Sequence, residues 1–189
     1  VKFPCSHKEE EELIQIEGGV CAAKGFTAAG VAAGIKKENK KDMALVYSQV
    51  PAVSAGVFTT NLVKAFCVQR NRELVKAGHP IQAFVANSGC ANACTGEEGR
   101  KNNQTEAEHM AKALGIEPEA VLTAATGVIG AQLPMEAVLS GTELLAQNQG
   151  ASKEAALSAA TAIMTTDTVP KEAGGDFMLG GKTEHTGGK

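Results

Sequence analysis

Aromatic residues are scarce in this chain of 189 residues, which has no tryptophan, one tyrosine and six phenylalanines. Glycine is abundant instead, with 21 residues. Such a composition favours binding sites built from loops and main-chain groups, because glycine lets backbone segments approach closely. The length and the hydrophobic fraction of 43% still allow a real core, and we expect a single domain over residues 1–189.

Two kinds of segment that would indicate other functions are also missing. The formal net charge of -3 and the scattered lysines provide no basic field, so we expect no nucleic-acid partner. No run approaches the roughly 18 apolar residues of a membrane span, and residues 1–19 lack an apolar signal core. We therefore expect a globular cytoplasmic protein that has no membrane partner.

Metal, cofactor and nucleophile motifs are absent as well. The cysteines are odd in number and dispersed, which favours reduced thiols; they are Cys5, Cys21, Cys67, Cys90 and Cys94. Cys90 and Cys94 have no second ligand pair, so we expect no metal, and their role stays open. The chain has no phosphate-binding, dinucleotide-binding, zinc-protease or serine-hydrolase motif, and we expect no cofactor. None of the four histidines lies in a recognisable catalytic motif; they are His7, His79, His109 and His185. Of these, His109 is expected on a helix surface.

Strand and helix patterns mix throughout the chain. The expected strands cover 43–47, 53–58, 81–87 and a segment from 121 that runs into a glycine loop ending at 130. Residues 48–52 form the turn between the first two, and residues 88–99 are expected to be irregular. The expected helices cover 71–78, 102–115, 134–149 and 152–164, with stops at Gly78 and Gly115 and a cap at Ser152. This order predicts an α/β fold class, a layered sandwich with mixed sheets.

Three segments rich in small polar residues carry the candidate chemistry. Residues 87–96 form a glycine and asparagine loop whose amides could face a ligand. Thr126 and Gly127 follow a predicted strand and offer a hydroxyl and an amide to one oxygen, as an oxyanion requires. Thr165 begins a cluster of hydroxyls, a carboxylate and a lysine that could hold an amino acid. Taken singly, each is explained as well or better by ordinary turns and helix caps.

Four segments in this order resemble the ornithine acetyltransferases, also called glutamate N-acetyltransferases. They are GVFTTNLVKA (56–65), VANSGCANACTG (85–96), TGVIG (126–130) and IMTTDTVPK (163–171). The resemblance covers nearly the whole chain, and four segments at compatible spacing are more specific than any one. Cys90 is a departure, because many relatives carry asparagine there.

The resemblance implies that this chain is the N-terminal α chain of a precursor that cleaves itself. Family members cut an Ala-Thr bond, and the new N-terminal threonine of the separate β chain is the nucleophile. In the family register Gly187 and Gly188 lie shortly before the cut, so that Lys189 is not the family's substrate-contacting lysine. The implied assembly is an α2β2 heterotetramer.

The implied reaction is ping-pong transfer of an acetyl group from N-acetylornithine to glutamate, in arginine biosynthesis. In this resemblance Thr126 and Gly127 match the oxyanion pair, and Thr165 matches a substrate-binding threonine. The sequence leaves open whether acetyl-CoA also serves as a donor. Two alternatives remain: a related N-terminal-nucleophile amidohydrolase, and a noncatalytic amino-acid-binding subunit.

Overall fold

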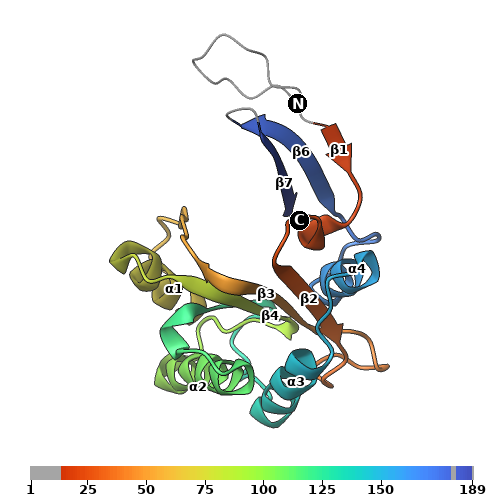
Figure 1. Cartoon of the computed structure of the whole chain (residues 1–189). Helices are drawn as coiled ribbons and strands as arrows, with labels where there is room; N and C mark the ends of the chain where they lie inside the picture. The colour runs from red at the N-terminus through yellow and green to blue at the C-terminus, as the bar shows by residue number, and fades with distance from the viewer. Residues whose placement is uncertain (1–13, 180–181, 189) are drawn as a thin grey trace.

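A four-stranded sheet forms the centre of the computed structural model, which describes residues 14–179 and 182–188 (Figure 1). Its strands, in spatial order, are β2 (Phe26–Val31), β3 (Met43–Ala52), β4 (Ile81–Cys90) and β5 (Val121–Val128). The β2/β3 and β3/β4 pairs are antiparallel, whereas β4 and β5 run parallel. The sheet is therefore mixed, as the sequence predicts.

Helices cover both faces of this sheet, which gives the expected layered α/β architecture. The main core joins one face to α2 (Gly96–Leu114) and α3 (Met135–Gln147) and is centred on Met43, Leu45, Val85, Met110, Val121, Val138 and Leu145. On the opposite face, α4 (Lys153–Ala162) packs through the small residues Ala28, Ala44, Ala159 and Ala162. Alternate residues of β2 and β3 thus serve different layers, as the two-residue period of a strand requires.

The remaining elements lie beside and beyond the main sheet. Helix α1 (Phe66–Ala77) packs against β5, and the 3-10 turn η2 (Pro118–Ala120) leads into that strand. A second sheet has the order β1-β6-β7, all antiparallel, with strands Ile14–Ile16, Ala173–Leu179 and Lys182–Gly188. Figure 1 places it at the far end of the molecule from α2, next to the 3-10 turn η1 (Gly19–Ala22). The sequence patterns did not predict this sheet or β2.

The predicted strand over 53–58 is wrong, and so is the turn before it. Strand β3 continues through residues 48–52, with Ser48 paired to Phe26 and Ala52 to Ile81. A register shift between Tyr47 and Ala52 accommodates Pro51, which has no N–H to donate. Residues 53–61 then have no regular structure, and the side chains of Val53 and Val57 are fully exposed. Alternation of apolar residues there does not indicate a buried face.

The prediction that residues 88–99 are irregular is also wrong in part. Ser88–Cys90 extend β4, and Gly96–Gly99 form the first turn of α2, which leaves only the residues between them outside regular structure. Two carboxylates, Glu97 and Glu98, lie in that first turn, where their negative charge stabilises the positive end of the helix dipole. Helix α1 likewise begins at Phe66, five residues before the predicted start.

The predicted helix stops at Gly78 and Gly115 and the predicted helix start at Ser152 are confirmed, but the prediction for His109 is not. Gly78 and Gly115 adopt left-handed conformations at the ends of α1 and α2, and the Ser152 hydroxyl accepts a hydrogen bond from the Ala155 N–H at the start of α4. His109 is half-buried rather than a surface residue, and its Nδ1 lies 2.7 Å from the Thr142 hydroxyl of α3. The helix pair α2/α3 buries one side of the ring because the two helices pack closely.

Two further features of the described residues are the state of the cysteines and the length of the helices. Cys21, Cys67, Cys90 and Cys94 are free thiols, while Cys5 lies outside the described residues. None of the described helices is long and apolar enough to cross a membrane.

Candidate functional site

Thr126 and Gly127 lie at the end of β5, directly beside the glycine loop that ends β4. In the parallel register Ser88 pairs with Thr126 and Gly89 with Gly127. Gly127 has φ +133°, and a Cβ at this position would overlap the Gly89 carbonyl. Only glycine fits here, for conformational and steric reasons together. The two segments that sequence analysis singled out therefore meet as neighbouring strand ends.

A third segment, the loop at 33–36, is held against these strand ends by a buried carboxylate. Asp42 is fully buried, and its two oxygens accept four backbone N–H groups, from Ala33 (2.7 Å), Gly34 (3.1 Å), Ile35 (2.7 Å) and Lys36 (2.8 Å). Hydrogen bonds to an ionised acceptor are stronger than neutral ones, so this loop is well fixed. The Asp42 carbonyl also accepts the Ser88 N–H at 2.8 Å, which ties the loop to β4.

Lys36 connects this loop to the segment that contains Thr165. Its Nζ donates to the Met164 carbonyl at 2.5 Å and to the Lys41 carbonyl at 3.1 Å. Thr165 directly follows Met164, beyond the end of α4. Helix α4 is itself fixed to β4, because the Ser88 hydroxyl donates to the Ala162 carbonyl. These contacts bring residues from three distant parts of the sequence to one place.

One cavity of about 660 Å³ unites the three residues that the sequence predicts for the site. Thr126 and Gly127 line it from β5 and Thr165 from the segment after α4. The rest of its lining is Ile35, Lys36, Lys37, Glu38, Lys40, Gly89, Val128 and Thr166. The wall thus offers hydroxyls, a glycine main chain and three lysines against one carboxylate, Glu38. Such a lining suits an anionic ligand with a carbonyl group.

The charged groups of this cavity differ in how far they are neutralised. Lys40 and Glu38 form an exposed ion pair at 2.8 Å, which contributes little energy. Lys36 is half-buried, and its burial lowers the pKa of its ammonium, opposed in part by the charge of Asp42. Histidine, cysteine and serine are absent from the described lining. The described cavity therefore combines hydroxyl and main-chain donors with three lysines and one carboxylate.

Lys36 and Asp42 were missed as site-forming residues by sequence reasoning, whereas Gly89 lies in the glycine and asparagine loop that the sequence indicated. Lys36 lies in a lysine-rich stretch that is typical of a solvated surface, and Asp42 reads as the polar start of a strand. Only the fold reveals that one carboxylate organises four amides and that one ammonium joins two loops. No signal in a single sequence distinguishes these residues from neighbouring charges.

The two cysteines of the glycine loop are packing and turn residues in this structure. Cys90 is buried, its Sγ lies 3.5 Å from the Ala131 carbonyl, and burial raises the pKa of its thiol. Cys94 is exposed and adopts φ +57°. Within the described residues, no group of three or more His, Cys, Asp or Glu side chains could hold a metal ion.

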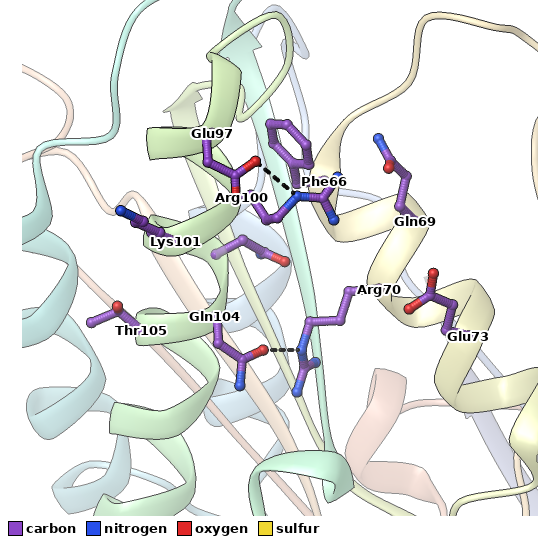
Figure 2. Close-up of a pocket in the computed structure, with 10 residues that line it drawn as sticks. Phe66, Gln69, Arg70, Glu73, Glu97, Arg100, Lys101, Gln104 and Thr105 are labelled. Atoms are coloured by element: carbon purple, nitrogen blue, oxygen red, sulfur yellow. Dashed lines mark hydrogen bonds and ion pairs between the residues drawn. The ribbon is translucent and has the colours of Figure 1, made fainter.

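A second cavity, of about 510 Å³, lies between α1 and α2, and Figure 2 shows its side chains. Arg70 donates to the Val121 carbonyl (2.5 Å), the Pro118 carbonyl (2.6 Å) and the Gln104 Oε1 (3.2 Å). Arg100 lies 4.9 Å from the centre of the Phe66 ring and 3.4 Å from the Glu97 carboxylate. Both guanidinium groups thus have partners within the chain. None of the predicted site residues lines this cavity.

Comparison with known proteins shows the family to which this chain belongs. The chain belongs to the ArgJ family, whose model matches residues 27–188. Among curated relatives, the arginine biosynthesis bifunctional protein ArgJ of Gloeobacter violaceus is 46% identical over 92% of this chain and 42% of its own length. That of Symbiobacterium thermophilum is 50% identical over 89% of this chain and 42% of its own length. The chain therefore spans less than half the length of these relatives.

Two solved structures share the fold over nearly the whole chain. The arginine biosynthesis bifunctional protein of Bacillus halodurans has a TM-score of 0.90 at 37% identity, covering 95% of this chain and 93% of that one. The ornithine acetyltransferase of Mycobacterium tuberculosis, solved in complex with ornithine, has a TM-score of 0.84 at 36% identity, covering 94% and 96%. The expected fold class is thereby confirmed.

Proposed function

We propose that this chain is the α chain of a self-cleaved precursor that transfers an acetyl group from N-acetylornithine to glutamate. The observation that carries the proposal is the single cavity that unites Thr126, Gly127 and Thr165. In this proposal residues 1–189 form one domain, which a separate β chain completes, and the assembly is an α2β2 heterotetramer. The names of the relatives, which place them in arginine biosynthesis, support the same reaction.

The lengths of the matched chains support the cleavage. The curated relatives are matched over about 42% of their length, whereas the two solved chains are matched over 93% and 96% of theirs. Solved relatives thus contain a chain of about this size. The described lining of the cavity has donors but no histidine, cysteine or serine, which fits a nucleophile supplied by another chain.

The proposed chemistry proceeds through an acetyl-threonine ester. The hydroxyl of the β chain's N-terminal threonine attacks the acetyl carbonyl of N-acetylornithine, and its free α-amine accepts the proton. The Thr126 hydroxyl and the Gly127 N–H donate to the oxyanion of the tetrahedral intermediate. Ornithine leaves with the proton, and the amine of glutamate then attacks the ester to give N-acetylglutamate and free threonine. Thr165 donates a hydrogen bond to the bound substrate.

The other candidate function of the same site is transfer of an acetyl group from a second donor, acetyl-CoA, to glutamate. Several relatives are named bifunctional, and transfer from acetyl-CoA to glutamate uses the same ester and the same acceptor. An assay that supplies acetyl-CoA and glutamate without N-acetylornithine separates the two reactions. Formation of N-acetylglutamate supports this second function, and its absence limits the enzyme to exchange between amino acids.

The proposal is tested on the protein expressed from its full-length precursor. Intact-mass analysis should reveal two polypeptides, and incubation with N-acetylornithine labelled in the acetyl group should label the N-terminal threonine of the second one. Addition of glutamate should then move the label to N-acetylglutamate. Release of labelled acetate irrespective of glutamate would favour an amidohydrolase. Amino-acid binding without acetylation would favour a binding subunit, and an uncut active chain would refute the cleavage.

A further inference from the structure

Lys36 has a hydrogen-bonding capacity that its partners do not use up. An ammonium group has three donors, and within the described part of the chain the Nζ of Lys36 bonds to two acceptors, the carbonyls of Met164 and Lys41. Both acceptors are neutral main-chain groups. One donor is therefore left at the cavity that Lys36 lines.

The charge of Lys36 is likewise not neutralised by an ion pair in the described residues. Asp42 is the acidic group that acts on it, but both Asp42 oxygens already accept N–H groups from the loop. Glu38, the carboxylate in the cavity wall, pairs with Lys40. Burial lowers the pKa of the Lys36 ammonium, since a desolvated cation is less stable. An anionic ligand would relieve this cost.

Lys36 also lies between the two parts of the proposed site. Its Cγ is 3.1 Å from where a Cβ of Gly89 would be, and Gly89 pairs with Gly127 at the proposed oxyanion position. At its other end, the ammonium bonds to the carbonyl that precedes Thr165. A side chain that touches both segments can set the position of a ligand relative to the donors of the oxyanion.

From this geometry we infer that Lys36 binds the α-carboxylate of the acetyl donor and of the amino-acid acceptor. The inference rests on the proposed function and names a specificity residue for it. In an N-acetyl amino acid the amide that reacts and the carboxylate share one carbon, so an anchored carboxylate fixes the acetyl carbonyl near the oxyanion donors. Lys36 thereby selects α-amino acids over amines that lack the carboxylate.

The test compares N-acetylornithine with its α-carboxamide, in which the carboxylate is replaced by a neutral amide. For the processed wild-type enzyme we expect kcat/KM to favour the carboxylate by about 10-fold to 100-fold, as for a charged hydrogen bond. Lys36→Met should reduce this preference to about 3-fold or less. Lys36→Gln, which keeps amide donors for the Met164 carbonyl, should lose the preference as well while maturing more like the wild type.

Lys41→Met is the matched control, because Lys41 is exposed, bonds to the Ser158 hydroxyl and lies outside the cavity lining. It removes the same charge nearby and should keep the wild-type preference. If the Lys36 variants lost kcat/KM equally for the carboxylate and the carboxamide substrates, Lys36 would have only a structural role and the inference would be overturned. A wild-type enzyme without preference for the carboxylate would overturn it without any variant. Absence of acetyl transfer in the wild type would instead overturn the proposed function itself, and this inference with it.

Discussion

The two cavities described above both contain basic side chains, but these side chains have different partners. Between α1 and α2, Arg70 and Arg100 have carbonyl, amide, carboxylate and ring partners within the chain. At the ends of β4 and β5, Lys36 bonds only to main-chain carbonyls, in the described residues, and forms no ion pair. The two guanidinium groups of the first cavity thus hold segments of the fold together, whereas the spare donor of Lys36 is suited to a ligand.

The largest expected effect concerns Glu106, a carboxyl of α2. Unlike the two arginines of the first cavity, it has no hydrogen-bond partner among the described residues. Glu106 is buried, its two oxygens accept no hydrogen bond from the described residues, and burial raises its pKa from 4.5 to about 8 despite the charge of Arg70. As pH rises, the unfolded chain loses this proton near 4.5, whereas the folded protein keeps it up to about pH 8. Over that interval the unfolded state binds fewer protons, so this group makes stability fall as pH rises.

Glu106→Gln removes this penalty because glutamine stays neutral. The free energy of unfolding of the variant should equal that of the wild type near pH 4. As pH rises the variant should become more stable than the wild type, by at most about 5 kcal/mol above pH 8. Thermal unfolding measured at several pH values checks it. Glu108→Gln is the matched control, because it makes the same substitution at an exposed position of the same helix. A stability difference that does not depend on pH would mean that Glu106 ionises normally in the folded protein.

The next effect concerns Thr126 and the proposed oxyanion. Thr126→Val keeps the shape but removes a donor that acts only on charge in the transition state. We expect kcat to fall by about 10²-fold, or about 2.7 kcal/mol, with a much smaller change in KM. Because self-cleavage also passes through a tetrahedral species, variant kinetics are measured on protein whose processing is first verified by mass. Thr105→Val removes a hydroxyl from the other cavity and should leave kcat unchanged.

A smaller effect is expected for Thr165, whose hydroxyl is proposed to contact the substrate. Thr165→Val should weaken substrate binding by about 0.5–1.5 kcal/mol, as for one neutral hydrogen bond, and raise KM accordingly. Thr168→Val is the control, because Thr168 is exposed in the same segment but outside the cavity lining. Unchanged KM values for both N-acetylornithine and glutamate in the Thr165 variant would remove this residue from the site.

The periodicity of apolar residues predicted the elements whose burial is regular. It failed where pairing with a distant strand decides whether a segment forms a strand. Helices α2, α3 and α4 follow from apolar spacing and caps, since these signals are local. Strand β2, made mainly of small residues, has no such pattern and forms because β3 and α4 lie against it. Residues 53–58 alternate like a strand but find no partner strand in the described part of the chain.

The site shows the same limit. Thr126, Gly127 and Thr165 were found because four motifs together resembled a family, and the fold then brought these residues to one cavity. Lys36 and Asp42 were not found, because their role depends on carbonyls and amides of other segments. Because every residue has a main-chain carbonyl, partners of this kind leave no pattern in the sequence from which they could be predicted.

The smallest expected effect sharpens the comparison of the cavities most directly. Arg100→Met removes one positive charge from the α1/α2 cavity, just as Lys36→Met does from the other. The Arg100 side chain is 55% exposed, so its ion pair with Glu97 and its contact with Phe66 each contribute less than about 1 kcal/mol. We expect a small loss of stability in thermal unfolding, and kcat/KM for N-acetylornithine within about 2-fold of the wild type. A loss of activity comparable to that of Lys36→Met, in a variant with wild-type stability, would mean that the first cavity also binds substrate and that internally satisfied cations do not distinguish structural from binding cavities.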